Sequence, residues 1–458
     1  MKIRFNMVIE DTEPIELLNM ERGELQAGNI GLSSAEVKSL LSCGQKALID
    51  AQATVYARHQ QCEQCKNALR FKGHNTIVLR TLYGKIDVDS PRFYRCICRT
   101  PRTSSRASFS PLAEILPERT TPEFQYFQAK WASLMSYGMT LNLLNDVLPI
   151  GDDLSKEGIR DNVARIVQRL DHELGEEPES IITQGIIEQL LNPLETQEPL
   201  VVGIDGGYVH ARNGSRQEGC FEVIVGKSIP AKGDTKCFGF VQRIEGKPKR
   251  RLQDILDSQG FQANQPIVFL SDGADTVRNL QRDMSPNAEH ILDWFHVTMR
   301  LTVMGNLVAG LHNGRMRSRS TVFADLLESV KWNIWHGKVD RSLERAKELR
   351  KKLAKASAVS RENARKLRGK LGKFIGYISA NRDFIPNYGK RYRAEKLITT
   401  SFAESTVDQV VSRRFVKKQK MRWTERGCHS VLQLRTRVIN DELRSVMQGW
   451  YPGLQIAA

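Results

Sequence analysis

Two aspartates stand directly after short apolar segments that are typical of buried strands. Asp205 follows residues 200–204 and Asp272 follows residues 266–271, and glycines lie beside both acids. If the two strands are neighbours in one sheet, both carboxylates lie on the same rim, where a hard cation between them would offset their repulsion. The alternative is a structural one, because an acid beside glycine commonly closes a turn.

A two-metal site needs a third carboxylate, and we expect it on a helix. Glu404 is the favoured candidate, with Glu395 and Asp408 as alternatives. Three carboxylates can hold two Mg²⁺ or Mn²⁺ ions about 4 Å apart, one activating water or a 3′-hydroxyl and the other stabilising the leaving oxygen on phosphorus. Glu404 also fits a capping box that begins at Ser401, which would be a purely structural role.

Four cysteines form a possible metal knuckle near the N-terminus. Cys62 and Cys65 are followed, after a predicted β-hairpin, by Cys96 and Cys98. Two thiolate pairs that a hairpin brings together fit a structural Zn²⁺ site. The second pair is Cys-x-Cys, which departs from the usual ribbon spacing, so four unrelated cysteines remain the alternative.

The order of elements indicates the fold around the aspartates. Residues 200–296 are predicted to form three strands, a helix, a strand, a helix and a strand, which is the order of the RNase H-like α/β fold. Long helical patterns fill residues 297–396. Fold order alone says little about function.

The charge balance points to a polyanionic partner. The 458 residues contain 68 Lys and Arg against 52 Asp and Glu, a net charge of +16, and no apolar run is long enough to span a membrane. The basic surplus concentrates in the C-terminal half, and a further basic segment surrounds Trp423, a residue that either stacks on an unpaired base or packs into the core. The candidate DNA-binding residues there are Lys417, Lys418, Lys420, Arg422 and Trp423.

Three helices predicted over residues 120–175 form a second candidate DNA-binding region. A break at Pro149-Ile150-Gly151 and a possible cap at Ser155 make a helix-turn-helix plausible, with the helix after Ser155 as the DNA-reading one. An ordinary helical bundle is the alternative.

Together these motifs resemble a known family. Gly203-Ile204-Asp205-Gly206-Gly207, Ser271-Asp272-Gly273-Ala274-Asp275, Asp293-Trp294-Phe295-His296 and Ala403-Glu404-Ser405 are similar to the DDE transposases of bacterial insertion sequences, closest to the ISKra type and more distantly to the Mutator and hAT types. The resemblance covers roughly residues 60–440. It implies an RNase H-like core with an all-helical insertion, a catalytic triad of Asp205, Asp272 and Glu404, and a D-x-x-H motif. In that motif Asp293 and His296 would be auxiliary residues, unless His296 is simply a core histidine.

The resemblance also implies an activity and its setting. We expect Mg²⁺-dependent cleavage and transfer of DNA strands, with transposon ends and target DNA as partners, a homo-oligomeric state and no membrane. A non-catalytic DNA-binding regulator, a decayed transposase and a nuclease of the same fold that only hydrolyses are the rivals. The N-terminus lacks the pattern of a secretory signal, so we expect a cytoplasmic protein, associated with the nucleoid when it is bound to DNA.

These expectations divide the chain into eight parts. They are an N-terminal helical segment (1–60), a zinc-knuckle hairpin (61–118), a helical region that binds DNA ends (119–175), an acidic linker (176–199), a first part of the core (200–296), the helical insertion (297–396), a second part of the core with the Glu404 helix (397–447) and a tail (448–458).

Overall fold

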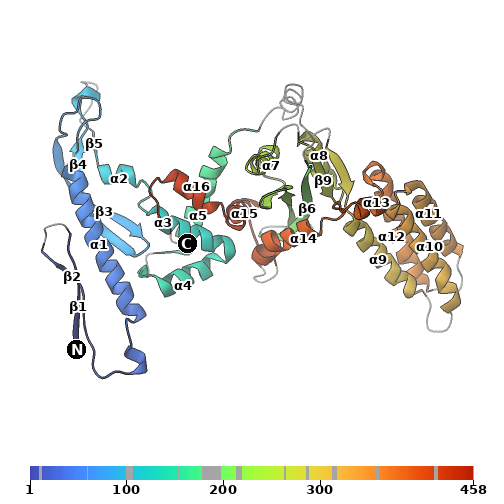
Figure 1. Ribbon diagram of the computed structural model, residues 1–458, viewed down its shortest axis with the longest axis horizontal. Helices are drawn as coiled ribbons and strands as arrows, with labels where there is room; N and C mark the ends of the chain where they lie inside the picture. Colours follow the sequence, from blue (N-terminus) through green and yellow to red (C-terminus); the bar gives the residue numbers. More distant parts are fainter. Residues whose placement is uncertain are drawn as a thin grey trace. The chain divides into compact units, whose positions relative to one another are not determined.

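The protein is seen in a computed structural model, shown in Figure 1. It describes residues 1–9, 13–58, 60–99, 107–151, 154–177, 198–212, 219–262, 265–284, 288–311, 317–355, 360–416 and 421–456, without the side chains of residues 57, 58, 99, 276, 283, 317–321 and 402–404. The chain divides into two units. Unit 1 contains Met1–Arg169 and Asp441–Ala458, and unit 2 contains Leu170–Asn440. None of the described helices is both long and apolar enough to serve as a membrane span.

Unit 1 begins with an antiparallel β-hairpin, which corrects the helical prediction for the start of residues 1–60. Strands β1 (Lys2–Met7) and β2 (Ile15–Glu21) pair, and only then, after a short 3₁₀ turn, η1 (Ala27–Asn29), does helix α1 (Ser34–Arg58) follow. Exposed and half-buried residues alternate along β1, the period of a strand rather than a helix. A capping box opens α1, because Ser33 N–H donates to the Glu36 carboxylate and Glu36 N–H donates to Ser33 Oγ.

The hairpin predicted between the two cysteine pairs is confirmed. Strands β3 (Phe71–Thr81) and β4 (Gly84–Tyr94) pair over their whole length, and a short strand β5 (Ser108–Phe109) joins the end of β4. Their apolar side packs against Ala53 of α1. The 3₁₀ turn η2 (Ile97–Arg99) and helix α2 (Pro111–Ile115) flank β5 in the chain.

Three helices follow, as the sequence predicts. They are α3 (Pro122–Leu134), α4 (Tyr137–Val147) and α5 (Lys156–Glu173), with Ser136 and Ser155 each accepting a hydrogen bond from a main-chain N–H of the helix that follows it. The break between α3 and α4 falls at Met135 and Ser136. Within unit 1 the expected tail begins inside a further helix, α16 (Leu443–Trp450), which packs against α3.

The core of unit 2 is a mixed five-stranded sheet, whose element order along the chain is the predicted one. Its strands lie in the order β10-β9-β6-β7-β8. Strands β10, β9 and β6 are parallel to one another, and β7 is antiparallel to both of its neighbours, β6 and β8. Helices α7 (Pro248–Asp257) and α8 (Asp275–Met284) share a buried cluster with one face of this sheet. The strand bounds are β6 (Leu200–His210), β7 (Cys220–Ile229), β8 (Lys236–Val241), β9 (Ile267–Ser271) and β10 (Glu289–Leu292).

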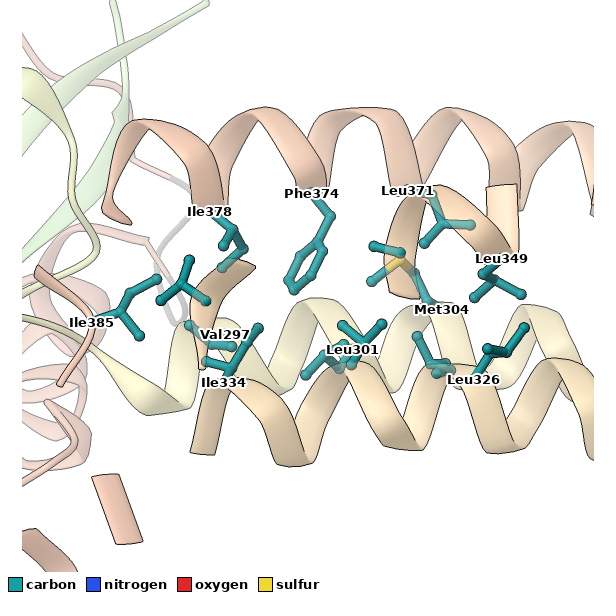
Figure 2. Close-up of a cluster of buried hydrophobic side chains, with 14 of the residues drawn as sticks. Val297, Leu301, Met304, Leu326, Ile334, Leu349, Leu371, Phe374, Ile378 and Ile385 are labelled. Atoms are coloured by element: carbon teal, nitrogen blue, oxygen red, sulfur yellow. The ribbon is translucent and has the colours of Figure 1, made fainter. Parts of the chain in front are cut away.

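A helical bundle follows β10, and the described residues of 297–396 contain no strand, as predicted. Apolar side chains at steps of three and four residues point from its helices into one core; Figure 2 shows Leu301 and Met304 facing Leu371 and Phe374. The core continues onto β9 and β10, so the bundle and the sheet share one buried interior. Its elements are α9 (Trp294–Ala309), α10 (Arg317–Trp335), α11 (Val339–Lys355), α12 (Arg361–Ala380), the 3₁₀ turn η4 (Arg382–Phe384) and α13 (Tyr388–Arg393).

The chain then returns to the sheet. Helix α14 (Ser401–Val407) packs on β6 and β7, continues as the π-helical segment η5 (Asp408–Val416), and is followed by α15 (Glu425–Ile439), which packs on β8. Buried Arg435 of α15 donates from Nε to the main-chain oxygen of Val410 at 2.9 Å, which ties α15 to the π-helical turn.

Candidate active site

Asp205 and Asp272 lie next to each other at one edge of the sheet. Ile204 of β6 pairs in register with Ser271 of β9, so the next residue along each strand is one of the two aspartates. Neighbouring strands are about 4.8 Å apart, which brings the two carboxylates onto one rim. Leu292 of β10 pairs with the same Ser271, so Asp293 takes the equivalent position on the third strand. The spatial neighbourhood of Asp205 and Asp272 that the sequence predicts is therefore present.

Each of the two aspartates has one oxygen held by the backbone and one oxygen open. Oδ1 of Asp205 accepts the N–H of Gly206 at 2.8 Å, and Oδ1 of Asp272 accepts the N–H of Ala274 at 2.9 Å. Neither Oδ2 accepts a hydrogen bond from any described residue. Burial raises the pKa of Asp205, the charges of Asp272 and Asp293 raise it further, and His296 and the Gly206 N–H oppose the increase. A bound cation would relieve this repulsion.

The helical bundle fixes the loop that carries Asp272. Tyr377 of α12 donates its hydroxyl to the main-chain oxygen of Asp272 at 3.0 Å, and Arg278 donates to the main-chain oxygen of Gly273 at 2.8 Å. Gly273 has a φ of +82°, and a Cβ there would come within 2.9 Å of Leu292 Cδ1, so only glycine fits this turn. Burial raises the pKa of Tyr377, which keeps its hydroxyl protonated as a donor.

Asp293 and His296 form the D-x-x-H pair that the resemblance implies, and they lie beside Asp205. Asp293 is fully buried and caps α9 by accepting the N–H of Phe295 at 2.8 Å. It also accepts hydrogen bonds from the Thr400 N–H and hydroxyl and shares one with His296 Nδ1 at 2.8 Å. Both carboxylate oxygens of Asp293 are therefore engaged in hydrogen bonds, unlike those of Asp205 and Asp272.

His296 reaches from this buried aspartate to the rim. Its Nε2 lies 3.9 Å from Asp205 Oδ1. Burial lowers the pKa of His296, but the hydrogen bond to Asp293 and the charges of Asp293, Asp205 and Asp272 outweigh that effect, and the net pKa is raised. The ring of His296 therefore lies between two carboxylates, those of Asp293 and Asp205.

The backbone of Glu404 lies between two anchors of α14, and its side chain is outside the described part of the structure. At one end Thr400 donates to Asp293; at the other, Val407 Cγ1 is 3.3 Å from a Cβ built on Gly207, two residues beyond Asp205 on β6. Between these anchors α14 packs on β6 and β7. At the start of α14 the Ser401 N–H donates to Thr399 Oγ1 at 3.4 Å, and the capping-box alternative for Ser401 and Glu404 stays open.

The two alternative acids have other surroundings. Glu395 is exposed just after α13, at a residue with φ of 56°. Asp408 accepts Arg413 Nε at 3.3 Å, so a cation of the chain already faces it.

Sequence reasoning missed one carboxylate near this rim, Glu222. Its Oε1 lies 3.4 Å from a Cβ built on Gly206, and burial together with the charge of Asp272 raises the pKa of Glu222. In the sequence, Glu222 stands out only as an acid inside the otherwise apolar run Phe221–Val225. The pairing of β7 with β6 brings it close to the aspartate rim.

The four cysteines gather into one cluster, and they are the only group of three or more potential ligands this close among the described side chains. Pairing of Phe71 with Phe93 brings the two ends of the β3–β4 hairpin together. The cluster's ligand atoms all lie within 4.8 Å of one another, and Cys62–Cys98 and Cys65–Cys96 are each 3.4 Å apart. Four sulfurs around a zinc ion with bonds of about 2.3 Å would be about 3.8 Å apart, so the cluster could hold Zn²⁺.

The electrostatics of the cysteine cluster favour a thiolate at one position. Hydrogen bonds from the main chain at Cys65 and Gln64 lower the pKa of Cys62 to about 6, against its burial. The turn that provides them is closed by Lys66 N–H donating to the Cys62 main-chain oxygen at 2.8 Å. Thiolates are the form that binds zinc.

The basic segment around Trp423 gives a different result from the prediction. Trp423 is only 6% exposed; its ring contacts Phe415 edge-to-face and lies under the guanidinium of Arg414. The prediction that an unpaired base stacks on Trp423 is therefore wrong, and the alternative, a core residue, holds. Main-chain hydrogen bonds to His210 and Arg212 hold it beside the end of β6. Arg422 is exposed, while Lys417, Lys418 and Lys420 lie outside the described residues.

No known family model matches this chain, and no curated protein is significantly similar to it. The function therefore has to be argued from the side chains themselves. They offer two chemically distinct places, the aspartate rim in unit 2 and the cysteine cluster in unit 1.

Proposed function

We propose that this protein is a DNA transposase that cleaves and transfers DNA strands with a carboxylate triad. The observation that carries the proposal is the register of β6 and β9, which sets Asp205 and Asp272 side by side with one open oxygen each. Glu404, on the stretch of α14 between Thr400 and Val407, is the proposed third member.

The strand order supports the fold part of this proposal. Read in chain order from β6 as strand 1, the sheet order is 3-2-1-4-5 with only strand 2 antiparallel to its two neighbours, the arrangement of an RNase H-like core. The helical bundle between β10 and α14 would then be the insertion into that core. Fold by itself does not establish an activity, so the side chains at the rim must provide the argument.

The donor set fits Mg²⁺ or Mn²⁺, because it consists of carboxylate oxygens on a rim where negative charge is otherwise unbalanced. Asp205, Asp272 and Glu404 would hold the ions. When bound, two such ions activate the attacking oxygen and stabilise the leaving one. His296, held by Asp293, would orient Asp205 and balance part of its charge.

Zinc in unit 1 is proposed to be structural. Cys62, Cys65, Cys96 and Cys98 would fill all four positions of a tetrahedral ion, leaving none open for chemistry. The closed site would fasten the two ends of the β3–β4 hairpin.

The DNA-binding parts are proposed from charge and shape. Helices α3–α5 would bind the element's ends, and Lys417, Lys418, Lys420 and Arg422 would contact phosphates. We place this activity in the bacterial cytoplasm, with the protein acting as a homo-oligomer on transposon ends and target DNA.

A strand-transfer assay tests the function. Purified protein is incubated with Mg²⁺ and a labelled duplex that carries the DNA flanking its own gene, together with a target plasmid. Joined products that disappear in Asp205→Asn and Asp272→Asn support the transposase. Cleaved but unjoined products would favour the hydrolysing nuclease, and binding without cleavage would favour the regulator.

A further inference from the structure

Helices α11 and α12 carry far more cations than their own acids can neutralise. Helix α11 has seven Lys and Arg against three acids, and α12 has six against one. Both helices bury one apolar stripe in the bundle; Figure 2 shows Leu371, Phe374 and Ile378 of α12 pointing into that core. Their charges therefore lie on the remaining, solvent-facing sides.

Five exposed cations lie within about two helical turns of the point where the two helices meet. Arg350 of α11 lies against Gly372 of α12, with its guanidinium carbon 3.7 Å from a Cβ built there, so these sides of the helices face each other. Along α11, Lys347 lies three residues before Arg350 and Lys351 directly follows it; along α12, Arg368 and Arg365 lie four and seven residues before Gly372. The set, which we call the α11–α12 seam, consists of Lys347, Arg350, Lys351, Arg365 and Arg368, all exposed.

The seam differs from the other flank of the same helices in its pairing. Arg345 and Lys352 both pair with Glu348, and Lys366 pairs with Glu362. In contrast, no described carboxylate lies within ion-pair distance of any seam cation, and the one electrostatic partner among the described residues is Glu362, whose pKa Arg365 helps to lower. Uncompensated cations at this density repel one another, so an external anion would stabilise them.

The seam also lacks what a lipid or protein partner would need. Among the described residues, no large apolar side chain is exposed on α11 or α12. Membrane surfaces and protein hot spots are normally contacted through such anchors. From Arg365 to Gly372 α12 rises about 10 Å, close to the axial rise of three base pairs, which suits repeated contacts to phosphates.

We infer that the α11–α12 seam binds the sugar-phosphate backbone of duplex DNA. The inference rests on the proposed function, whose catalytic residues it does not include, and it assigns DNA contacts to the helical bundle itself. Contacts of this kind position the duplex without reading its sequence.

Two matched triple variants of the full-length protein test the seam. Lys347→Gln/Lys351→Gln/Arg365→Gln removes three seam charges, and Arg345→Gln/Lys352→Gln/Lys366→Gln removes the same residue types from the paired flank. Both are solvent-exposed sites, and circular dichroism checks that both variants fold. Affinity for a labelled 30-base-pair duplex of arbitrary sequence is measured by fluorescence anisotropy between 50 and 200 mM KCl, without magnesium.

The seam triple is expected to flatten the log–log salt slope by about 2–3, since each lost phosphate contact removes about 0.9. The control triple should change it by less than about 1. Equal slopes for the two triples, no binding of duplex by the unmodified protein, or a seam effect seen only with phosphatidylserine vesicles or an acidic peptide would overturn the inference. Absence of cleavage alongside a seam-dependent slope would instead reject the proposed function and leave the seam standing.

Discussion

The hydroxyl of Tyr377 donates a hydrogen bond to the main-chain oxygen of Asp272 at 3.0 Å, across 105 residues of sequence. Tyr377 belongs to the helical bundle and Asp272 to the end of a sheet strand, so the bundle takes part in shaping the rim. Without this hydrogen bond, the loop after β9 would have no such support from the helical bundle. The connection makes the bundle a contributor to the geometry of the candidate metal site.

Replacing Tyr377 with Phe tests this connection. The loss of one buried hydrogen bond should lower the free energy of unfolding by about 1–3 kcal/mol. The Mg²⁺ concentration needed for half-maximal cleavage should rise several-fold, because the Asp272 loop is less well held, while affinity for duplex DNA stays unchanged. Tyr392→Phe is the control, since Tyr392 is 64% exposed. A Mg²⁺ dependence identical to that of the unmodified protein would refute the positioning role.

Acid should weaken the attachment of the N-terminal hairpin to α1. The hydrogen-bonded Arg22 lowers the pKa of Glu36 to about 2 from its usual 4.5, and Ser33 adds to that effect. A carboxyl whose pKa falls on folding stabilises the folded state above its unfolded pKa and loses that contribution as the pH falls toward its folded pKa. The difference in melting temperature between the unmodified protein and Glu36→Gln should therefore be constant above about pH 5 and shrink between pH 4.5 and about 2.

Glu16→Gln provides the comparison for this measurement. Glu16 faces Arg4 at 3.8 Å in an exposed pair, whereas Arg22 and Glu36 are 2.6 Å apart and mostly covered. Glu16→Gln should therefore change the melting temperature by much less than Glu36→Gln does. The same pH profile in both variants would contradict a specific role for the Arg22–Glu36 pair.

The zinc proposal predicts a metal content. The purified protein should contain about one Zn²⁺ per chain by mass spectrometry, and Cys62→Ser or Cys98→Ser should remove it. Amide hydrogens of residues 60–98 should then exchange faster, because the two ends of the hairpin are no longer fastened. Cys43→Ser, an exposed cysteine outside the cluster, should keep the metal. If the unmodified purified protein contains no zinc, the proposal is wrong.

The sequence was informative where a local pattern also determined the tertiary position. Asp205 follows an apolar run but lies inside β6, which continues to His210, whereas Asp272 directly follows the end of β9. The parallel pairing of the two apolar runs was enough to bring the aspartates together. The cysteines could be grouped because a hairpin with a tight turn separates them. In both cases a few residues of local structure decided which side chains meet.

Other features depended on contacts that no local pattern carries. Glu222 joins the rim only because β7 pairs with β6 in a particular register, and a one-residue shift would turn it away. Trp423 follows a basic segment that suggested nucleic acid, but main-chain bonding beside His210 places it in the core. The β1–β2 hairpin was missed because its short alternation was outweighed by the strong helical pattern that follows it.

Glu404 either caps helix α14 or binds a metal ion, and the two roles predict opposite effects of its replacement on stability and on the rate of cleavage. A capping residue contributes about 1 kcal/mol to stability and nothing to chemistry. A metal ligand contributes little to stability, and its loss costs orders of magnitude in the rate of cleavage. The anchoring of Thr400 on Asp293 holds the start of α14 beside the aspartate rim and favours the second role.

Glu404→Gln separates the two roles, because glutamine can still cap a helix but is a poor ligand for Mg²⁺. We expect this variant to melt within a few degrees of the unmodified protein, to bind duplex DNA with the same affinity and to cleave at least a thousandfold more slowly, as judged by a gel-based nicking assay. Asp408→Asn is the matched control one helical turn later, where the ion pair with Arg413 is lost, and it should cleave at a near-normal rate. Near-normal cleavage by Glu404→Gln, or an equal loss in Asp408→Asn, would move the third carboxylate elsewhere, and Glu222→Gln would be the next variant to test because Glu222 already lies within electrostatic reach of Asp272.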